Sequence, residues 1–257
     1  MKTKHFGWLR DSLDVRDKFF APKIAAPEVL QSVDLRDKYI LPPIQDQGQL
    51  GSCTANGIAS VLAFDLLNKH TGANTGLTYP SRLFIYYNER VIENTVQSDS
   101  GAQIRDGIKS VSHSGVCDEK EWPYKVSKFK TKPSKKCFKD AMKFLALNYA
   151  KIDNTDKGAI VSALLSGFPV VYGFTVYESF ESDEVAKTGV VPMPLFTEQI
   201  LGGHCVYIVG YDVASDRFTC ANSWNITWGN KGFFTIPAQY ICDARLASDF
   251  WVIQSVL

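Results

Sequence analysis

The sequence lacks the features that would mark a membrane protein or a nucleic-acid-binding protein. No run approaches the ~18 consecutive apolar residues of a membrane-spanning helix. The first ten residues contain no apolar segment of the kind found in secretory signals. The formal net charge of +1 provides no bulk attraction for a polyanion. We therefore expect no membrane partner and no nucleic-acid partner. We expect a cytoplasmic or otherwise reducing location, with virion packaging or non-classical delivery as further routes.

The cysteines show another absence, because no C-x-x-C pair occurs among them. If Cys53 is set aside for the reason given below, an odd number remains, which does not indicate a complete disulfide framework. Free thiols in a reducing compartment are the simpler interpretation, although one or two bridges stay open. Zinc binding by His204, Cys205 and Cys220 is disfavoured, since neighbouring strand residues point to opposite faces. We expect no metal and no cofactor. The six cysteines are Cys53, Cys117, Cys137, Cys205, Cys220 and Cys242.

What is present is an ordinary globular composition, 45% hydrophobic and 21% charged. A length of 257 residues suffices for one large domain or for two lobes around a cleft. Helical patterns dominate the first half and strand patterns the second, which predicts an α+β protein. The lysine-rich stretch from Lys125 to Lys143 is interpreted as a solvated loop and helix face.

Residues 1–32 form a leader that does not have the pattern of a domain. It mixes charged residues with a few large apolar ones and ends in a stretch with two prolines, which favours an extended segment. Two roles are open for it. The leader either inhibits by lying in a cleft, which we favour, or packs on the surface as a structural strap. Its candidate apolar anchors are Trp8, Leu9, Phe19 and Phe20.

The densest signal is the run Ile44-Gln-Asp-Gln-Gly-Gln-Leu-Gly-Ser-Cys53 and the segment that follows it. This segment is apolar on nearly every side as far as Asn68, which is typical of a buried helix. Basic residues and then Gly72 indicate its end. Cys53 is therefore predicted at the N-terminus of a buried helix, where the helix dipole favours the nucleophilic thiolate.

Apolar periodicity predicts the other elements. Helices are expected at Tyr79–Asn88, with Pro80 in the first turn, and at Ile104–Val111. Alternating apolar residues and flanking turn residues indicate strands in the second half of the chain. These predicted strands are Phe168–Phe174, His204–Tyr211, Arg217–Ala221 and Gly232–Ile236.

His204 is the best of four histidines to act on the Cys53 thiol. It follows two glycines and opens an apolar strand, and the glycines would let a substrate backbone approach closely. Asn222 ends a neighbouring predicted strand and offers an amide to orient the imidazole. Cysteine, histidine and asparagine in this arrangement predict nucleophilic catalysis.

At these residues the chain resembles the papain family of cysteine peptidases, most closely its bacterial and viral xylellain-like branch. Gln47-Gly48 and Gly51-Ser52-Cys53 match the family's first block, and Gly203-His204 matches the second. Asn222-Ser-Trp224, followed by Trp228-Gly229, matches the third, except that Asn225 replaces a glycine. Leu50 stands where the family usually has a disulfide-forming cysteine, and Thr54 replaces a tryptophan.

The resemblance implies a fold and a reaction. The fold would have two lobes in a peptidase domain over 33–257: a mainly helical lobe at 45–145 and an antiparallel, barrel-like β lobe at 146–257. Cys53 would form an acyl-thioenzyme with a polypeptide substrate, with His204 as general base and acid and Asn222 orienting it. Gln47 would donate its side-chain amide to the oxyanion hole.

The resemblance also implies residues that bind substrate. Gly101 would hold the substrate backbone, Trp224 would cover the histidine–asparagine hydrogen bond, and Trp228 would line the primed side of the cleft. Ser248 would lie at the bottom of the pocket that binds the second residue before the scissile bond. The full predicted set is Gly51, Ser52, Gly101, Gly203, Trp224, Trp228 and Ser248.

Two alternatives to a hydrolase stay open. The same triad serves a transpeptidase or ligase, in which an amine instead of water resolves the acyl-enzyme. A catalytically silent fold that only binds peptides is the other alternative, and the intact catalytic residues argue against it.

Overall fold

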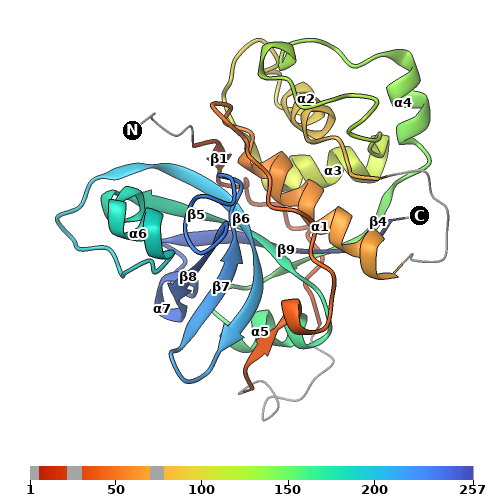
Figure 1. The fold of residues 1–257 in the computed structure, drawn as a ribbon. Helices are drawn as coiled ribbons and strands as arrows, with labels where there is room; N and C mark the ends of the chain where they lie inside the picture. The colour runs from red at the N-terminus through yellow and green to blue at the C-terminus, as the bar shows by residue number, and fades with distance from the viewer. Residues whose placement is uncertain (1–5, 22–30, 70–77, 257) are drawn as a thin grey trace.

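The computed structural model of the chain describes residues 6–21, 31–69 and 78–256. Helices dominate the first half of these residues and strands the second, so the predicted α+β class is confirmed. Figure 1 shows α2, α3 and α4 gathered above the large sheet, with α1 running between the two parts. The α-helices are α1 (Cys53–Lys69), α2 (Arg82–Ile92), α3 (Ile104–Ser114), α4 (Lys135–Ala141), α5 (Lys157–Leu165), α6 (Asp183–Thr188) and α7 (Ala238–Ile241).

Helix α1 is the buried helix that the sequence predicts, and it begins at Cys53. Every residue from Cys53 to Asp65 is buried, so this part of the helix packs against neighbours on all sides. It contacts α2 and α3 on one side and strands of the large sheet on the other. The N-terminus of α1 therefore lies at the junction of the helical part and the sheet.

Helix α2 begins later than predicted. The Ser81 side chain accepts a hydrogen bond from Phe84 N at 3.2 Å and caps the helix, whose first residue is Arg82. Pro80 therefore precedes the cap instead of lying in the first turn. The serine cap decides the start because it satisfies an amide that the first turn leaves unpaired.

Seven strands form one antiparallel sheet. Its order is β4-β9-β5-β6-β7-β8, and β2 pairs with β6 off this path. The 13-residue strand β6 is central and carries His204. The strands are β2 (Val33–Asp34), β4 (Ala146–Ile152), β5 (Val170–Tyr177), β6 (Ile200–Asp212), β7 (Arg217–Ala221), β8 (Phe233–Pro237) and β9 (Ala247–Val256).

The described part of the leader, residues 6–21, does not form a domain and crosses between the helices and the sheet. Its strand β1 (Trp8–Leu9) pairs in parallel with β3 (Ala102–Gln103), and Figure 1 shows β1 beside the N-terminal end of α1. Trp8 is buried and Phe20 packs against the core. The expectation for Leu9 and Phe19 was wrong, because they are 45% and 64% exposed.

No helix in the described ranges is both long and apolar enough to cross a membrane.

Candidate active site

Cys53 is the first residue of α1, and its side chain is fully buried. Burial raises the pKa of the thiol to about 12, while hydrogen bonds from the backbone amides of Cys205, Gly7 and Thr54 act in the opposite direction. Two of these amides come from β6 and from the leader. The thiol therefore faces the strand that carries His204 and lies beneath the leader.

His204 and Asn222 are in direct contact. His204 Nε2 and Asn222 Oδ1 lie 2.8 Å apart, and Asn222 Oδ1 also accepts from Ser223 N at 2.8 Å. Both side chains are buried. Trp224 stacks on the imidazole with ring centroids 4.7 Å apart, and Trp228 packs edge-on against Trp224. The tryptophans exclude water from the histidine–asparagine bond, which strengthens it.

The Gln47 side chain is fixed between the two parts of the molecule. Its Oε1 accepts from Ser223 Oγ at 2.6 Å, and its Nε2 donates to Leu50 O at 2.9 Å. Tyr124 holds the same loop, because its hydroxyl donates to Gln47 O at 2.8 Å and bonds Ser52 Oγ at 2.5 Å. Neither Ser223 nor Tyr124 was predicted to position Gln47. Ser223 lies inside the matched third block, whereas nothing local points to Tyr124.

The leader backbone lies directly on this group of residues. A Cβ atom added at Gly7 would lie 1.8 Å from Gly51 O, and one added at Gly101 would lie 2.2 Å from Gly7 O. One added at Gly203 would lie 2.4 Å from Trp8 O. Ala102 N also donates to Gly7 O at 2.8 Å. Three glycines predicted to bind substrate, Gly51, Gly101 and Gly203, therefore hold the leader backbone.

Trp8 fills a pocket between the leader and the sheet. A Cβ atom at Gly173 would lie 1.9 Å from the Trp8 ring, and Trp8 Nε1 donates to Asp249 Oδ2 at 3.1 Å. Ser248 pairs with Gly173 in the sheet register, so it lies by this pocket. The polar contact at the pocket comes from its neighbour Asp249, which was not among the predicted residues. Asp249 has φ of 60° at an irregularity between β5 and β9. No local sequence pattern predicts this left-handed conformation.

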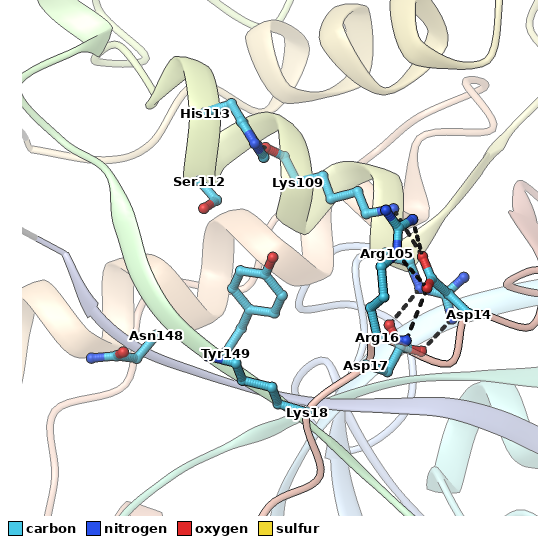
Figure 2. Close-up of a pocket in the computed structure, with 10 residues that line it drawn as sticks. All are labelled: Asp14, Arg16, Asp17, Lys18, Arg105, Lys109, Ser112, His113, Asn148 and Tyr149. Atoms are coloured by element: carbon cyan, nitrogen blue, oxygen red, sulfur yellow. Dashed lines mark hydrogen bonds and ion pairs between the residues drawn. The ribbon is translucent and has the colours of Figure 1, made fainter.

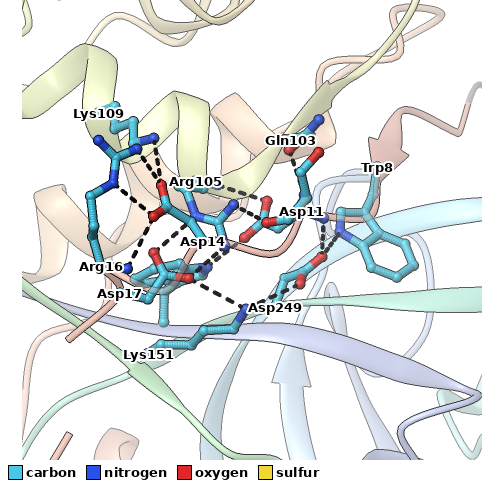
Figure 3. Close-up of polar contacts among 12 residues, drawn as sticks. Trp8, Asp11, Asp14, Arg16, Asp17, Gln103, Arg105, Lys109, Lys151 and Asp249 are labelled. Atoms are coloured by element: carbon cyan, nitrogen blue, oxygen red, sulfur yellow. Dashed lines mark hydrogen bonds and ion pairs between the residues drawn. The ribbon is translucent and has the colours of Figure 1, made fainter. Parts of the chain in front are cut away.

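A network of charges anchors the leader beyond Trp8, as Figure 3 shows. Arg105 pairs with Asp17 at 2.5 Å, and both side chains are at most 10% exposed. Asp11 Oδ1 accepts from Arg105 N at 3.0 Å, and Asp11 Oδ2 accepts from Trp251 Nε1 at 3.0 Å. Asp249 Oδ2 accepts from Asp11 N at 2.8 Å. Burial, and then the charge of Asp249, raise the pKa of Asp11 to about 7.

The leader also walls a pocket of about 570 Å³ against α3 and β4. Figure 2 shows Arg16 and Lys109 turned toward Asp14, with His113 and Tyr149 on the opposite side. Asp14 pairs with Arg16 at 2.7 Å and with Lys109 at 3.7 Å. None of the predicted site residues lines this pocket, so it belongs to the anchoring of the leader.

The chain is similar to known cysteine proteases. The sequence matches the family described as papain family cysteine protease over residues 29–250. A peptidase C1-like protein of Acanthamoeba polyphaga mimivirus is 49% identical over 218 residues, which cover 82% of this chain and 69% of the relative. Cathepsin B of Dictyostelium discoideum is 29% identical over 216 residues, which cover 75% of this chain and 64% of the relative.

Solved structures give the same result. Xylellain, a cysteine protease from Xylella fastidiosa, superposes with a TM-score of 0.90 at 37% sequence identity. The superposition covers 100% of this chain and 99% of the other. It therefore includes the described leader as well as the helices and the sheet.

Proposed function

Because the chain belongs to the papain family of cysteine proteases, we propose that it hydrolyses peptide bonds with Cys53, His204 and Asn222 as its catalytic triad. The observation that carries this proposal is the 2.8 Å contact of His204 Nε2 with Asn222 Oδ1. His204 lies on β6, and the backbone amide of its neighbour Cys205 lowers the pKa of the Cys53 thiol. A nucleophile, a base and a group that orients the base are thus supplied by three different elements.

The reaction proceeds in two steps. His204 takes the thiol proton, Cys53 Sγ attacks the carbonyl carbon, and the oxyanion accepts hydrogen bonds from Cys53 N and the Gln47 amide. His204 then donates the proton to the leaving amine, the C–N bond breaks and an acyl-thioester remains. A water molecule, deprotonated by His204, attacks the thioester and releases the acid and the thiol. Asn222 keeps the imidazole in the orientation that both steps need.

The nucleophile is tested with Cys53→Ala, and Cys242→Ala is the control because Cys242 is a partly buried cysteine outside the site. We expect Cys53→Ala to abolish cleavage of a peptide library read by mass spectrometry, and the control to cleave as the wild type. An epoxide affinity label should modify Cys53. Residual activity within tenfold of wild type would contradict the assignment. Adding an amine nucleophile separates hydrolysis from ligation by product mass.

We also propose that the leader inhibits the enzyme in cis. The support is its course over Gly51, Gly101 and Gly203, residues that would otherwise meet a substrate backbone. A tethered segment has an effective concentration of about millimolar order, so weak intrinsic binding suffices to exclude substrate. The strap is less consistent with this course, because a strap would not need to cross the thiol.

The leader is also presented in a way that resists cleavage at the contact. The Gly7 backbone amide acts to lower the pKa of the Cys53 thiol, while the Gly7 carbonyl oxygen accepts from Ala102 N at 2.8 Å. Nucleophilic attack needs a carbonyl carbon against the sulfur and its oxygen in the oxyanion hole. The Gly7 carbonyl oxygen is instead bonded to Ala102 N, so the leader occupies the site without being positioned as a substrate.

Gly7→Ala tests this inhibition with a single methyl group. The new Cβ would overlap Gly51 O, so the leader backbone would have to move away from the thiol. We expect kcat/KM on a small peptide to rise at least tenfold. Leu13→Ala is the control, since Leu13 is a leader residue that is 93% exposed. Lower activity of Gly7→Ala together with a lower Tm would support the strap, and would leave the test of Cys53 unaffected.

A further inference from the structure

Two cysteines and a glutamate that the proposed mechanism does not use lie together in the helical part of the molecule. Cys117 lies just after α3, Glu121 lies in the turn that follows, and Cys137 lies in the first turn of α4. One ligand atom from each lies within 4.8 Å of the other two. In the described ranges this is the one group of three cysteine, histidine or acidic side chains close enough to share a metal ion.

The two cysteines are buried, whereas the Glu121 side chain is 28% exposed and not fully satisfied by hydrogen bonds. Cys117 and Cys137 are 0% and 2% exposed. Glu121 Oε1 pairs with Lys136 Nζ, but Glu121 Oε2 is buried without a hydrogen-bond partner among the described residues. A buried carboxylate oxygen without a partner is costly and needs an explanation. A cation between this oxygen and the two sulfurs would provide one.

We propose that Cys117, Glu121 and Cys137 bind one zinc ion at a structural site that shares no residue with the proposed active site. Thiolates are soft ligands that select zinc over magnesium or calcium, and glutamate is an established zinc ligand. With zinc–sulfur bonds of about 2.3 Å, two sulfurs of a tetrahedral site lie about 3.8 Å apart. The ligand atoms lie within 4.8 Å of one another, so a contraction of at most about 1 Å reaches this geometry, and a water molecule completes the coordination.

The charges and protons balance. A free cysteine thiol carries its proton near neutral pH. Zinc replaces the protons of both thiols, and two protons are released. Two thiolates, one carboxylate and Zn²⁺ carry a net charge of −1, and the Lys136 ammonium beside Glu121 offsets it. Ser134 Oγ already donates to Cys137 Sγ at 3.1 Å and would hold that sulfur in place.

The site would fix α4 to the segment after α3. That segment in turn supports the loop that carries Gln47. It contains Glu119, which pairs with Arg82 at 2.6 Å. Arg82 in turn donates to Asp46 O at 3.3 Å and stacks on Tyr124, whose hydroxyl bonds Gln47 O. Zinc would therefore stabilise the fold around Gln47 without touching the substrate.

The experiment uses the full chain carrying Cys53→Ala, which removes a competing reactive thiol and prevents self-cleavage. The protein is dialysed against a chelator, given Zn²⁺, dialysed again without chelator and analysed by elemental mass spectrometry. We expect about one zinc per chain, with two protons released on binding, and loss of at least nine-tenths of the zinc on adding Cys137→Ser. Cys242→Ser is the matched control and should retain the metal. Co²⁺ in place of Zn²⁺ should give a thiolate-to-cobalt charge-transfer band that Cys137→Ser weakens.

Glu121→Gln covers the case in which Cys137→Ser does not fold. The variant changes a carboxylate into an amide of the same shape, and we expect at least a tenfold weaker affinity for zinc with unchanged circular dichroism. Zinc that stays bound in both variants would place the metal elsewhere and overturn the proposal. Absence of zinc from the parent protein would also overturn it. In that case a mass two hydrogens lower would identify a Cys117–Cys137 disulfide, and free thiols would identify an unmodified pair.

Discussion

At the scale of single residues, the Cys53 thiol is subject to two opposite influences. Its place at the start of α1 favours the thiolate, because the helix dipole and the unpaired amides stabilise negative charge. Burial acts against this and raises its pKa to about 12 in the docked state. The backbone amide of Gly7 in the leader lowers this pKa, but burial is the larger effect. The thiol of the proposed nucleophile is therefore favoured in its protonated form in this arrangement.

Gln47 allows a prediction at the same scale. Gln47→Ala should lower kcat by about 10²–10³ with little change in KM, because the amide acts mainly on the oxyanion in the transition state. Steady-state kinetics in the Gly7→Ala background would measure both constants with the leader displaced. Ser223→Ala should produce a smaller loss of kcat, since it removes only the hydrogen bond that positions Gln47 Oε1. A rise in KM alone would instead make Gln47 a substrate-binding residue.

At the scale of the element, the leader depends on one large anchor. Trp8 is 6% exposed, whereas its neighbour Leu9 is 45% exposed. Fully burying a large apolar side chain contributes about 1.5–3 kcal/mol. Trp8 adds a hydrogen bond to Asp249 at 3.1 Å. Most of the apolar contribution of β1 to docking therefore comes from a single side chain.

Trp8→Ala should accordingly weaken the docking of the leader and expose the Cys53 thiol. Because ~1.4 kcal/mol corresponds to a factor of ten, we expect the alkylation rate of Cys53 by iodoacetamide to rise roughly 10- to 100-fold. Peptide mapping would identify the alkylated cysteine. Leu9→Ala is the matched control and should change the rate less than threefold. Equal rates for the two variants would show that Trp8 does not hold the leader over the thiol.

At the scale of the whole molecule, docking joins the two ends of the chain through a pair of carboxyl groups. Asp11 in the leader lies against Asp249 in β9, and other groups near Asp11 include Arg105, Trp251 and the acid Glu93. Burial, and then the Asp249 charge, raise the pKa of Asp11 from 3.8 to about 7. The docked leader therefore binds a proton more tightly than the free leader.

The sign of the pH dependence follows from this shift. The raised pKa favours docking while Asp11 is protonated, an effect that is complete below pH 3.8 and is lost as pH rises through about 7. We expect a labelled peptide to bind the Cys53→Ala protein at least tenfold more tightly at pH 8 than at pH 5, measured by fluorescence anisotropy. Asp11→Asn stays neutral, so its binding should vary much less with pH. Tighter peptide binding at pH 5 than at pH 8 by the Cys53→Ala protein would contradict the role assigned to Asp11.

The sequence by itself determined the features that depend on short runs and on periodicity. All-round apolarity after Cys53 predicted a buried helix starting at the nucleophile, and α1 begins there. Three short blocks identified the family, and Gln47, His204 and Asn222 as residues to examine. Such patterns are readable because neighbouring residues in one element share its geometry. The catalytic roles of these residues stay predictions until the variants are measured.

The tertiary structure alone decided where the leader goes and what holds it. The sequence did not decide whether the leader inhibits or acts as a structural strap, because the contacts of Gly7 with Gly51 and Gly101 join segments distant in the chain. The bond between Trp8 and Asp249 spans 241 positions and uses a left-handed aspartate that no periodicity reveals. A periodic pattern reports which face of an element is apolar, but it does not report which distant segment covers that face. The course of the leader is set by close approach between backbones, and only the folded chain brings those backbones together.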